Sequence, residues 1–393
     1  MALVDQIVLS SAQRNNLTSF ASRYGQVALL HVTSTMFAKS IADAHWTIRD
    51  LFRSSGFHDY TKQEVSPSNK VIKHCTMIQG SMETRTEISL YRPQTKHGDP
   101  RLWIYSLQQF AMAGDTLALA VINGALYVGN LNGIPIPAPS MLLGGDAAPW
   151  ASKEARELLE RVAHLASLGP ILQIGTHDPS VGVSIEHALG IDQNSSKLPD
   201  YLGTVEIKAA RTNRPSSATA RKQLFAQVPD WSLSECKSIR SFLTAYGYER
   251  NGVRRLTCTV DAKRPNSQGL LLQLADSGES LVEFHKPTMA PALKWELSTL
   301  QRRLEDKHHE TFWVRMDECL LKGKPAFNIL GIDHTGPPAS QLFGALVAEG
   351  QITLDHLIKD SPRGVTERGP SFKVTPAGHE VLFPIRARYN LSE

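Results

Sequence analysis

Three ionisable side chains lie close together in the segment PDYLGTVEIK, residues 199–208. Five residues separate Asp200 from Glu206, and Lys208 follows two positions later. Side chains alternate between the two faces of an extended strand, so Glu206 and Lys208 share a face while their neighbours enter the core. Gly203 can supply a bend that returns Asp200 towards Glu206. The spacing predicts two carboxylates and one ammonium group converging at the edge of a sheet.

This grouping suits the hydrolysis of a phosphodiester. Carboxylate oxygens are ligands that Mg²⁺ prefers, and the ion keeps water and phosphate oxygens in its remaining positions. Such an ion stabilises charge on the phosphate and helps to activate the attacking water. Lys208 would orient or deprotonate that water and offset negative charge in the transition state. The alternative is structural, because alternating charged and apolar residues also form an ordinary salt-bridged strand.

A short helix is predicted just before this strand, in the segment SVGVSIEHALG. Ile185 and Leu189 would face the core, at helical spacing. Glu186 on the same helix can then present a third carboxylate to the metal ion. Its alternative role is that of an exposed acid on a surface helix.

Composition places the chain among globular proteins with room for more than one core. It has 393 residues, of which 41% are hydrophobic and 20% charged, and a net charge of +4. A length of this order favours two domains. No apolar stretch is long enough to span a membrane, and the N-terminus lacks the features of a signal peptide. The four cysteines show no C-x-x-C spacing, which argues against a zinc ribbon and fits reduced thiols in the cytoplasm.

The charge of one segment indicates a binding partner more clearly than the net charge of the chain does. Residues 206–264 contain twelve Lys and Arg but only five Asp and Glu. Such a bias suits contact with a phosphate backbone, although a solvated basic face explains it equally well.

The order of elements predicts two domains joined by a proline-rich linker. The segment GIPIPAPSMLLGGDAAPW, residues 133–150, cannot hold a regular helix or central strand. We therefore predict an N-terminal domain over 1–135, a linker over 136–150 and a catalytic domain over 151–393. A helix capped by Ser152 opens the last of these.

Strands and helices alternate in both predicted domains. We expect a hairpin at LALAVINGALYVG, with Asn123-Gly124 in its turn, and part of a helix at HWTIRDLF. Further along we expect strands at 205–209, 255–261, 270–274 and 280–285, and helices at 294–307 and 339–349. The predicted fold is an α/β mixed sheet flanked by helices, preceded by a smaller α+β domain.

The run VSIEHALGIDQNSSKLPDYLGTVEIKAAR resembles the catalytic segment of the MvaI/BcnI restriction endonucleases, which are related to MutH and Sau3AI. The resemblance continues through KQLFAQVPDW, AYGYERNGVRRLTCTV and NSQGLLLQL to HTGPPASQLFGALVAEGQITLD and ERGPSFKVTPAGHEVLFP. It implies a PD-(D/E)xK nuclease fold. It also implies that Asp200, Glu206 and Glu186 bind Mg²⁺ and that Lys208 is the catalytic lysine.

Enzymes of this family are typically monomers that cut short pseudosymmetric sites of the CC(N)GG kind, nicking one strand after the other. The resemblance thus implies double-stranded DNA as substrate and a DNA methyltransferase as functional companion. Side chains that reach base edges would read the site. Candidates for DNA contact are Arg211, Arg315, His334, Arg368 and Lys373, for which phosphate contact or surface charge is the alternative.

The doublet His308-His309 has the look of a metal site. It lies in the charged segment DKHHE with no third ligand nearby, so we predict a solvated helix end instead.

The predicted N-terminal domain carries its own charged segment, ETRTEISLYRPQTKHGDPRLWIYSL. Arg85, Glu87 and Arg92 alternate there with apolar residues, a pattern suited to a DNA-facing sheet. The segment weakly resembles part of the B3-like effector domain of EcoRII-type enzymes, and UbaLAI-like enzymes join such a domain to an MvaI-like nuclease. A folding role for these charges is the alternative.

These observations favour a Mg²⁺-dependent type II restriction endonuclease whose N-terminal domain tethers it to DNA. Two other readings stay open. One is a MutH-like repair nickase that stops after one strand. The other is a DNA-binding regulator with a degenerate nuclease core, which the intact Asp200, Glu206 and Lys208 argue against.

Overall fold

The structure is a computed structural model, and it describes residues 8–95, 98–137, 142–143, 147–175, 180–191, 198–212, 219–362, 364–367 and 369–391. The chain divides into two compact units, each assembled from three segments. The first contains Met1–Pro139, Ala226–Gln301 and Ala339–Leu382; the second contains Ser140–Phe225, Arg302–Pro338 and Phe383–Glu393. The division after residue 139 falls inside the predicted linker, but later segments are grouped with the N-terminal one. The contiguous domain boundaries therefore stay a prediction.

The N-terminal part of the first unit is a mixed sheet with helices, the predicted α+β architecture. Its strands follow the order β1-β6-β7-β3-β4-β5-β2, and every pair is antiparallel except β3 with β7. Its elements are α1 (Ser11–Tyr24), β1 (Val27–His31), α2 (Ser34–Lys39), β2 (Ala42–Asp43), α3 (Trp46–Ser54), β3 (Val71–Gln79), β4 (Met82–Tyr91), β5 (Arg101–Ile104), β6 (Thr116–Ile122) and β7 (Ala125–Asn130).

Two local predictions for this part are confirmed. Helix α3 contains the segment HWTIRDLF from Trp46 onward, and β6 and β7 form the predicted hairpin. Its turn residues Asn123 and Gly124 have φ values of 50° and 77°. Positive φ at both positions is what a two-residue hairpin turn of the favoured hand requires.

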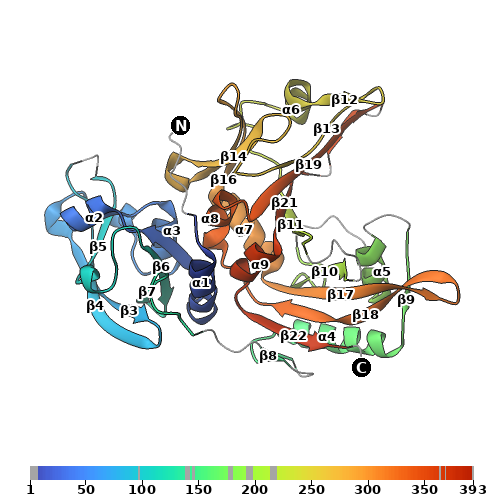
Figure 1. The fold of residues 1–393 in the computed structure, drawn as a ribbon, viewed down its shortest axis with the longest axis horizontal. Coiled ribbons are helices and arrows are strands. Elements are labelled where there is room, and N and C mark those ends of the chain that lie inside the picture. Colours follow the sequence, from blue (N-terminus) through green and yellow to red (C-terminus); the bar gives the residue numbers. More distant parts are fainter. Residues whose placement is uncertain are drawn as a thin grey trace. The chain divides into compact units, whose positions relative to one another are not determined.

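The later segments of the first unit form two further sheets (Figure 1). One is the meander β14-β15-β16, and the other contains β21-β19-β13-β12 with β20 paired to β19. The predicted strands at 255–261, 270–274 and 280–285 are confirmed. The elements are α6 (Ile239–Tyr246), β12 (Tyr248–Arg250), β13 (Val253–Val260), β14 (Leu270–Ala275), β15 (Ser280–His285), β16 (Ala290–Glu296), α8 (Phe343–Ala348), β19 (Ile352–Ser361), β20 (Gly364–Glu367), β21 (Ser371–Val374) and α9 (Pro376–Leu382).

The helix predicted over 294–307 was wrong at its start. Residues up to Glu296 belong to β16, where Leu293 and Trp295 are buried on alternate positions, and α7 (Leu297–His308) begins one residue later. Pairing with β15 stabilises the strand, and this tertiary pairing overrides local helix propensity. The helix predicted over 339–349 is shorter, because a 3₁₀ turn at Ser340–Leu342 precedes α8.

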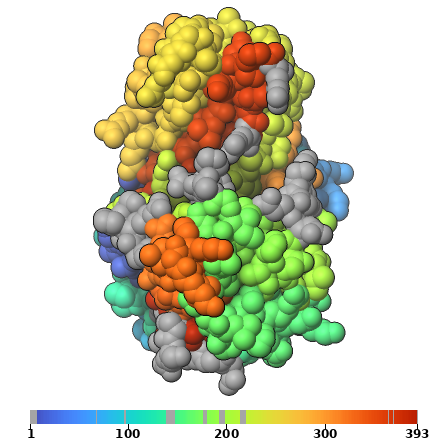
Figure 2. All heavy atoms as spheres, turned by 90° about the vertical axis from the view of Figure 1, so that its right-hand side faces the viewer, coloured from blue at the N-terminus to red at the C-terminus, as the bar shows by residue number. Residues whose placement is uncertain are grey.

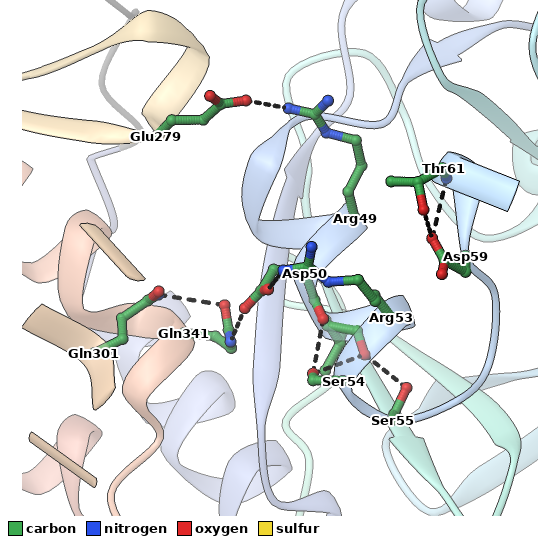
Figure 3. Close-up of polar contacts among 11 residues, drawn as sticks. Arg49, Asp50, Arg53, Ser54, Ser55, Asp59, Thr61, Glu279, Gln301 and Gln341 are labelled. Carbon is green, nitrogen blue, oxygen red and sulfur yellow. Dashed lines mark hydrogen bonds and ion pairs between the residues drawn. The ribbon is translucent and has the colours of Figure 1, made fainter. Parts of the chain in front are cut away.

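Polar contacts join α3 to the later segments of the same unit (Figure 3). The Arg49 guanidinium lies 2.8 Å from a Glu279 carboxylate oxygen. The Gln341 amide donates to Asp50 at 2.8 Å, and the Gln301 amide donates to Gln341 at 3.3 Å. Polar side-chain contacts thus link the N-terminal part of the first unit to its later segments.

A charged triad is sealed inside the first unit. His356 on β19 lies 2.9 Å from Glu283 and 3.2 Å from Glu367, and the side chains of His356 and Glu283 are fully buried. Burial disfavours the imidazolium, but the Glu283 and Glu367 carboxylates more than offset it and raise the pKa of His356 to about 9. The cation balances two buried acids on β15 and β20.

The second unit contains the sheet β10-β17-β18-β22-β8, with β9 also paired to β18. Strands β10 and β17 run parallel, and β17, β18 and β22 are antiparallel (Figure 1). Its elements are β8 (Leu142–Leu143), α4 (Lys153–Ser167), β9 (Ile171–Leu172), α5 (Ser180–Ala188), β10 (Val205–Arg211), β17 (Glu310–Leu321), β18 (Lys324–Thr335) and β22 (Arg386–Asn390). Strand β11 (Lys222–Ala226) and helix α7 carry the chain across the division between the units.

Helix α4 confirms the predicted start, since the Ser152 side chain accepts a hydrogen bond from the Ala155 N–H. Its buried face packs in one core with β10 and β17, through residues such as Leu158, Val205 and Phe312. The turn between β17 and β18 lies at the surface (orange in Figure 2). No helix in the described part of the chain combines the length and apolarity needed to cross a bilayer.

The buried triad predicts a pH-dependent stability of the first unit. A histidine whose folded pKa is raised contributes stability below its unfolded pKa of about 6.5, and this contribution is lost as pH rises through the folded value. The free energy of unfolding should therefore decline between about pH 6.5 and 9. His356→Gln should cost about 3 to 5 kcal/mol near neutral pH, because it removes one partner of a buried charge pair.

Urea unfolding followed by circular dichroism across this pH range would measure both effects. His285→Gln, on the neighbouring β15, is the matched control. A His356→Gln variant with the wild-type stability and pH profile would contradict the assignment.

Candidate active site

Strand β10 sets the geometry of the candidate site. Val205 and Ile207 are 0% and 3% exposed and pack in the core of the second unit. Glu206 lies between them and is also 0% exposed, whereas Lys208 is partly exposed. The Lys208 ammonium lies 2.5 Å from Glu206 Oε1. The structure thus brings together the two residues that strand periodicity placed on one face.

Asp200 returns to this strand through a tight turn. Leu202 and Gly203 have φ values of 52° and 70°, and Tyr201 and Val205 form an isolated antiparallel bridge. The bend predicted at Gly203 is therefore present. Asp200 Oδ2 accepts a hydrogen bond of 3.1 Å from the Ile207 N–H, which fixes its carboxylate beside β10.

Lys307, near the end of α7, completes the cluster. Its ammonium lies 2.7 Å from Glu206 Oε2 and 3.3 Å from Asp200 Oδ1, and it donates to the Leu198 carbonyl at 2.9 Å. Lys307 was not predicted from the sequence; it stands about a hundred positions after Asp200, in the segment DKHHE, where the two histidines were considered instead. Only the strand pairing that places α7 next to β10 reveals it.

Burial and neighbouring charges shift the pKa values of the carboxyl groups in the cluster. Burial raises the pKa of Glu206, and the charges of Lys208 and Lys307 oppose this rise. Burial also raises the pKa of Glu186 on α5, and the Asp200 charge adds to it. Glu186 therefore lies within electrostatic reach of the cluster, on the predicted helix.

The donor set fits a hard divalent cation. Asp200 and Glu206 each direct a carboxylate oxygen at the same point, which the Lys307 ammonium contacts, and carboxylate oxygens are ligands that a hard divalent ion prefers. Among the described residues, no group of three or more His, Cys, Asp or Glu side chains is close enough to hold a metal ion. Metal binding by Asp200, Glu206 and Glu186 therefore stays a prediction.

The His334 side chain is buried and has hydrogen-bond partners within the second unit. It is 1% exposed; its Nε2 lies 2.7 Å from Glu310 Oε1 and its Nδ1 lies 3.2 Å from the Tyr389 hydroxyl. Both ring nitrogens therefore have partners inside the second unit. DNA contact by His334 stays a prediction.

The solvated helix end predicted for His308 and His309 was wrong for His308. This side chain is fully buried, with Nε2 at 2.8 Å from the Leu224 carbonyl and Nδ1 at 3.0 Å from the Thr311 hydroxyl. Burial and the nearby Lys208 charge lower its pKa to about 3, so the ring is neutral. His309 is exposed, as predicted.

The arginine and lysine candidates of the nuclease segment have partners of their own. Arg211 lies 2.6 Å from Glu318 and is mostly buried, while Arg315 donates to Asn390 at 2.9 Å. Lys373, in the first unit, lies 2.8 Å from Asp355. Arg368 lies outside the described residues. DNA contact by these four side chains stays a prediction.

The three N-terminal candidates differ from one another. Arg85 and Glu87 are exposed on β4. Arg92 instead donates to the carbonyls of Gly98, Tyr60 and Gln63, which is a folding role. Arg85 is therefore the candidate best placed for a ligand in solution.

Comparison with solved structures supports the fold. The complex of the restriction endonuclease MvaI with its cognate DNA substrate matches with a TM-score of 0.50 and 17% identity, covering 61% of this chain and 99% of that one. MvaI in the absence of DNA is 16% identical and matches with a TM-score of 0.36, over 62% and 100% of the two chains. No curated protein sequence matches significantly.

The family comparison covers more than half of the chain. The model of the MvaI/BcnI restriction endonuclease family matches residues 159–383, which include β10, α7 and the whole cluster of Asp200, Glu206, Lys208 and Lys307. The predicted mixed α/β nuclease fold is confirmed by the solved MvaI structure. The chain belongs to the MvaI/BcnI restriction endonuclease family.

Proposed function

We propose that this restriction endonuclease hydrolyses DNA phosphodiester bonds with Mg²⁺ at the Asp200–Glu206–Lys208 cluster. The observation that carries the proposal is the convergence of two carboxylates on one cation, with a second ammonium on the same strand. Asp200 and Glu206 would hold the metal ion. When bound, the ion would stabilise negative charge on the phosphate and activate the attacking water.

The chain's own side chains have distinct tasks in this mechanism. The hydrogen bond from the Ile207 N–H orients the Asp200 carboxylate, and core packing of the neighbouring residues holds Glu206 in place. Lys208, partly exposed, can approach the scissile phosphate, orient the attacking water and offset charge in the transition state. Fixed groups of this kind need no reorganisation during the reaction.

We further propose a short pseudosymmetric site of the CCNGG type and successive nicking by a monomer. The similarity to MvaI, solved in complex with its cognate DNA substrate, supports a DNA substrate for this chain. One active site attacks one phosphodiester at a time, so a monomer has to bind twice to break a duplex. An N-terminal tether would raise the local concentration of the nuclease for the second nick. A cytoplasmic location and a companion methyltransferase complete this proposal.

Removal of site residues should abolish cleavage. Asp200→Asn and Lys208→Met should each slow plasmid cleavage by about 100-fold or more, because one weakens metal binding and the other removes the catalytic ammonium. Chelation of Mg²⁺ with EDTA should stop the wild type. Gel analysis of plasmid incubated with Mg²⁺ measures this, with Glu157→Gln on the exposed side of α4 as control. Equal cutting by the wild type and both variants would reject the site.

The order of strand cleavage tests successive nicking. On a plasmid with one site, open-circle DNA should accumulate first and then convert to linear DNA. A time course on agarose gels distinguishes successive nicking of both strands from nicking of one strand alone. Linear product without an open-circle intermediate would contradict successive nicking by a monomer, whereas open-circle DNA that never converts would indicate a repair nickase.

If β4 faces DNA, substitution of Arg85 should change the affinity of the protein for DNA. Arg85→Ala should weaken DNA binding modestly and reduce the salt slope of log affinity by about 1, as expected for one lost phosphate contact. Gel shifts in EDTA at several salt concentrations measure this without cleavage. Lys324→Ala, at the surface turn between β17 and β18, is the control. An unchanged salt slope would leave Arg85 with no part in the tether.

A further inference from the structure

Lys307 is bound by oxygen atoms in the manner of a small cation. An ammonium group has three N–H donors, and three oxygens surround this one: the Leu198 carbonyl, Asp200 Oδ1 and Glu206 Oε2. The side chain is only 10% exposed. Two of these oxygens, the Leu198 carbonyl and Asp200 Oδ1, accept hydrogen bonds from the ammonium, and Glu206 Oε2 forms an ion pair with it.

This arrangement offsets the repulsion between two neighbouring carboxylates. Two carboxylates held close together repel each other, and the buried Glu206 has little water to offset its charge. The Lys208 ammonium contacts Oε1 of Glu206, and the Lys307 ammonium contacts Oε2 of Glu206 and Oδ1 of Asp200. Lys307 thus occupies the space between the two carboxylates where a shared divalent ion would bind.

We propose that Lys307 is an internal cation that keeps the metal site assembled before metal binds and that a divalent ion must displace. This inference rests on the proposed function, because it takes Asp200 and Glu206 as the metal ligands. Lysine has a flexible four-carbon stem, and displacement would move its ammonium away from the carboxylates by rotation about the bonds of that stem. Displacement of one cation by another lowers the apparent affinity of the site for metal.

Neutral substitution should therefore tighten metal binding. In Lys307→Met and Lys307→Gln, Mn²⁺ should bind at least about tenfold more tightly than in the wild type, because a competing charge within contact distance is gone. Isothermal titration of the full chain with Mn²⁺, without DNA, measures this. Lys324→Met, which removes one exposed lysine at the turn between β17 and β18, should bind as the wild type does.

The titration separates two kinds of failure. If the wild type binds Mn²⁺, Asp200→Asn does not, and both Lys307 variants bind no more tightly than the wild type, the displacement is overturned and the metal site stands. If the wild type and Asp200→Asn bind alike or not at all, the proposed metal site falls as well. Lys307→Gln keeps a donor for the Leu198 carbonyl, so it serves if Lys307→Met does not fold.

A second measurement uses the wild type alone. Reductive dimethylation followed by mass spectrometry reports how accessible each amine is. Labelling of Lys307, relative to Lys324 in the same sample, should rise several-fold when Mg²⁺ is added without DNA, because the displaced ammonium reaches solvent. Labelling that is unchanged or reduced by Mg²⁺ would overturn the proposal.

Discussion

The site depends on how one buried carboxylate is balanced. Glu206 stands in the middle of a core strand with no exposed surface, where an unpaired charge would be strongly destabilising. Its two oxygens each face a different ammonium, Lys208 from the same strand and Lys307 from α7. These two ion pairs explain how the strand can hold a buried acid between Val205 and Ile207.

The parallel direction of β10 and β17 places the second ammonium group, that of Lys307, at the site. Because β10 and β17 are parallel, with Val205 opposite Glu310, the residues that precede both strands meet at one edge of the sheet. The turn that carries Asp200 precedes β10, and the end of α7 precedes β17. Parallel pairing therefore brings Asp200 and Lys307 together although they are far apart in sequence.

The features of the site that depend on local periodicity could be predicted from the sequence. Alternation along one strand predicted that Glu206 and Lys208 share a face, and the conformational freedom of glycine predicted the bend at Gly203. The link to Lys307 requires knowledge of which strand pairs with β10, and no hydrophobic pattern carries that information. The burial of His334, on the same face of β18 as Ile332, likewise depends on pairing with neighbouring strands. The family resemblance identified the nuclease segment, but not these pairings.

The segmented construction of the second unit has a consequence for biosynthesis. Strand β18 pairs with β22 through Thr335 opposite Arg386, so the sheet that supports the candidate site includes residues 386–390. A nascent chain that has grown only to residue 385 lacks this strand, and non-local pairing of this kind forms late in folding. The described sheet that carries β10 is therefore complete only after residues 386–390 have been synthesised.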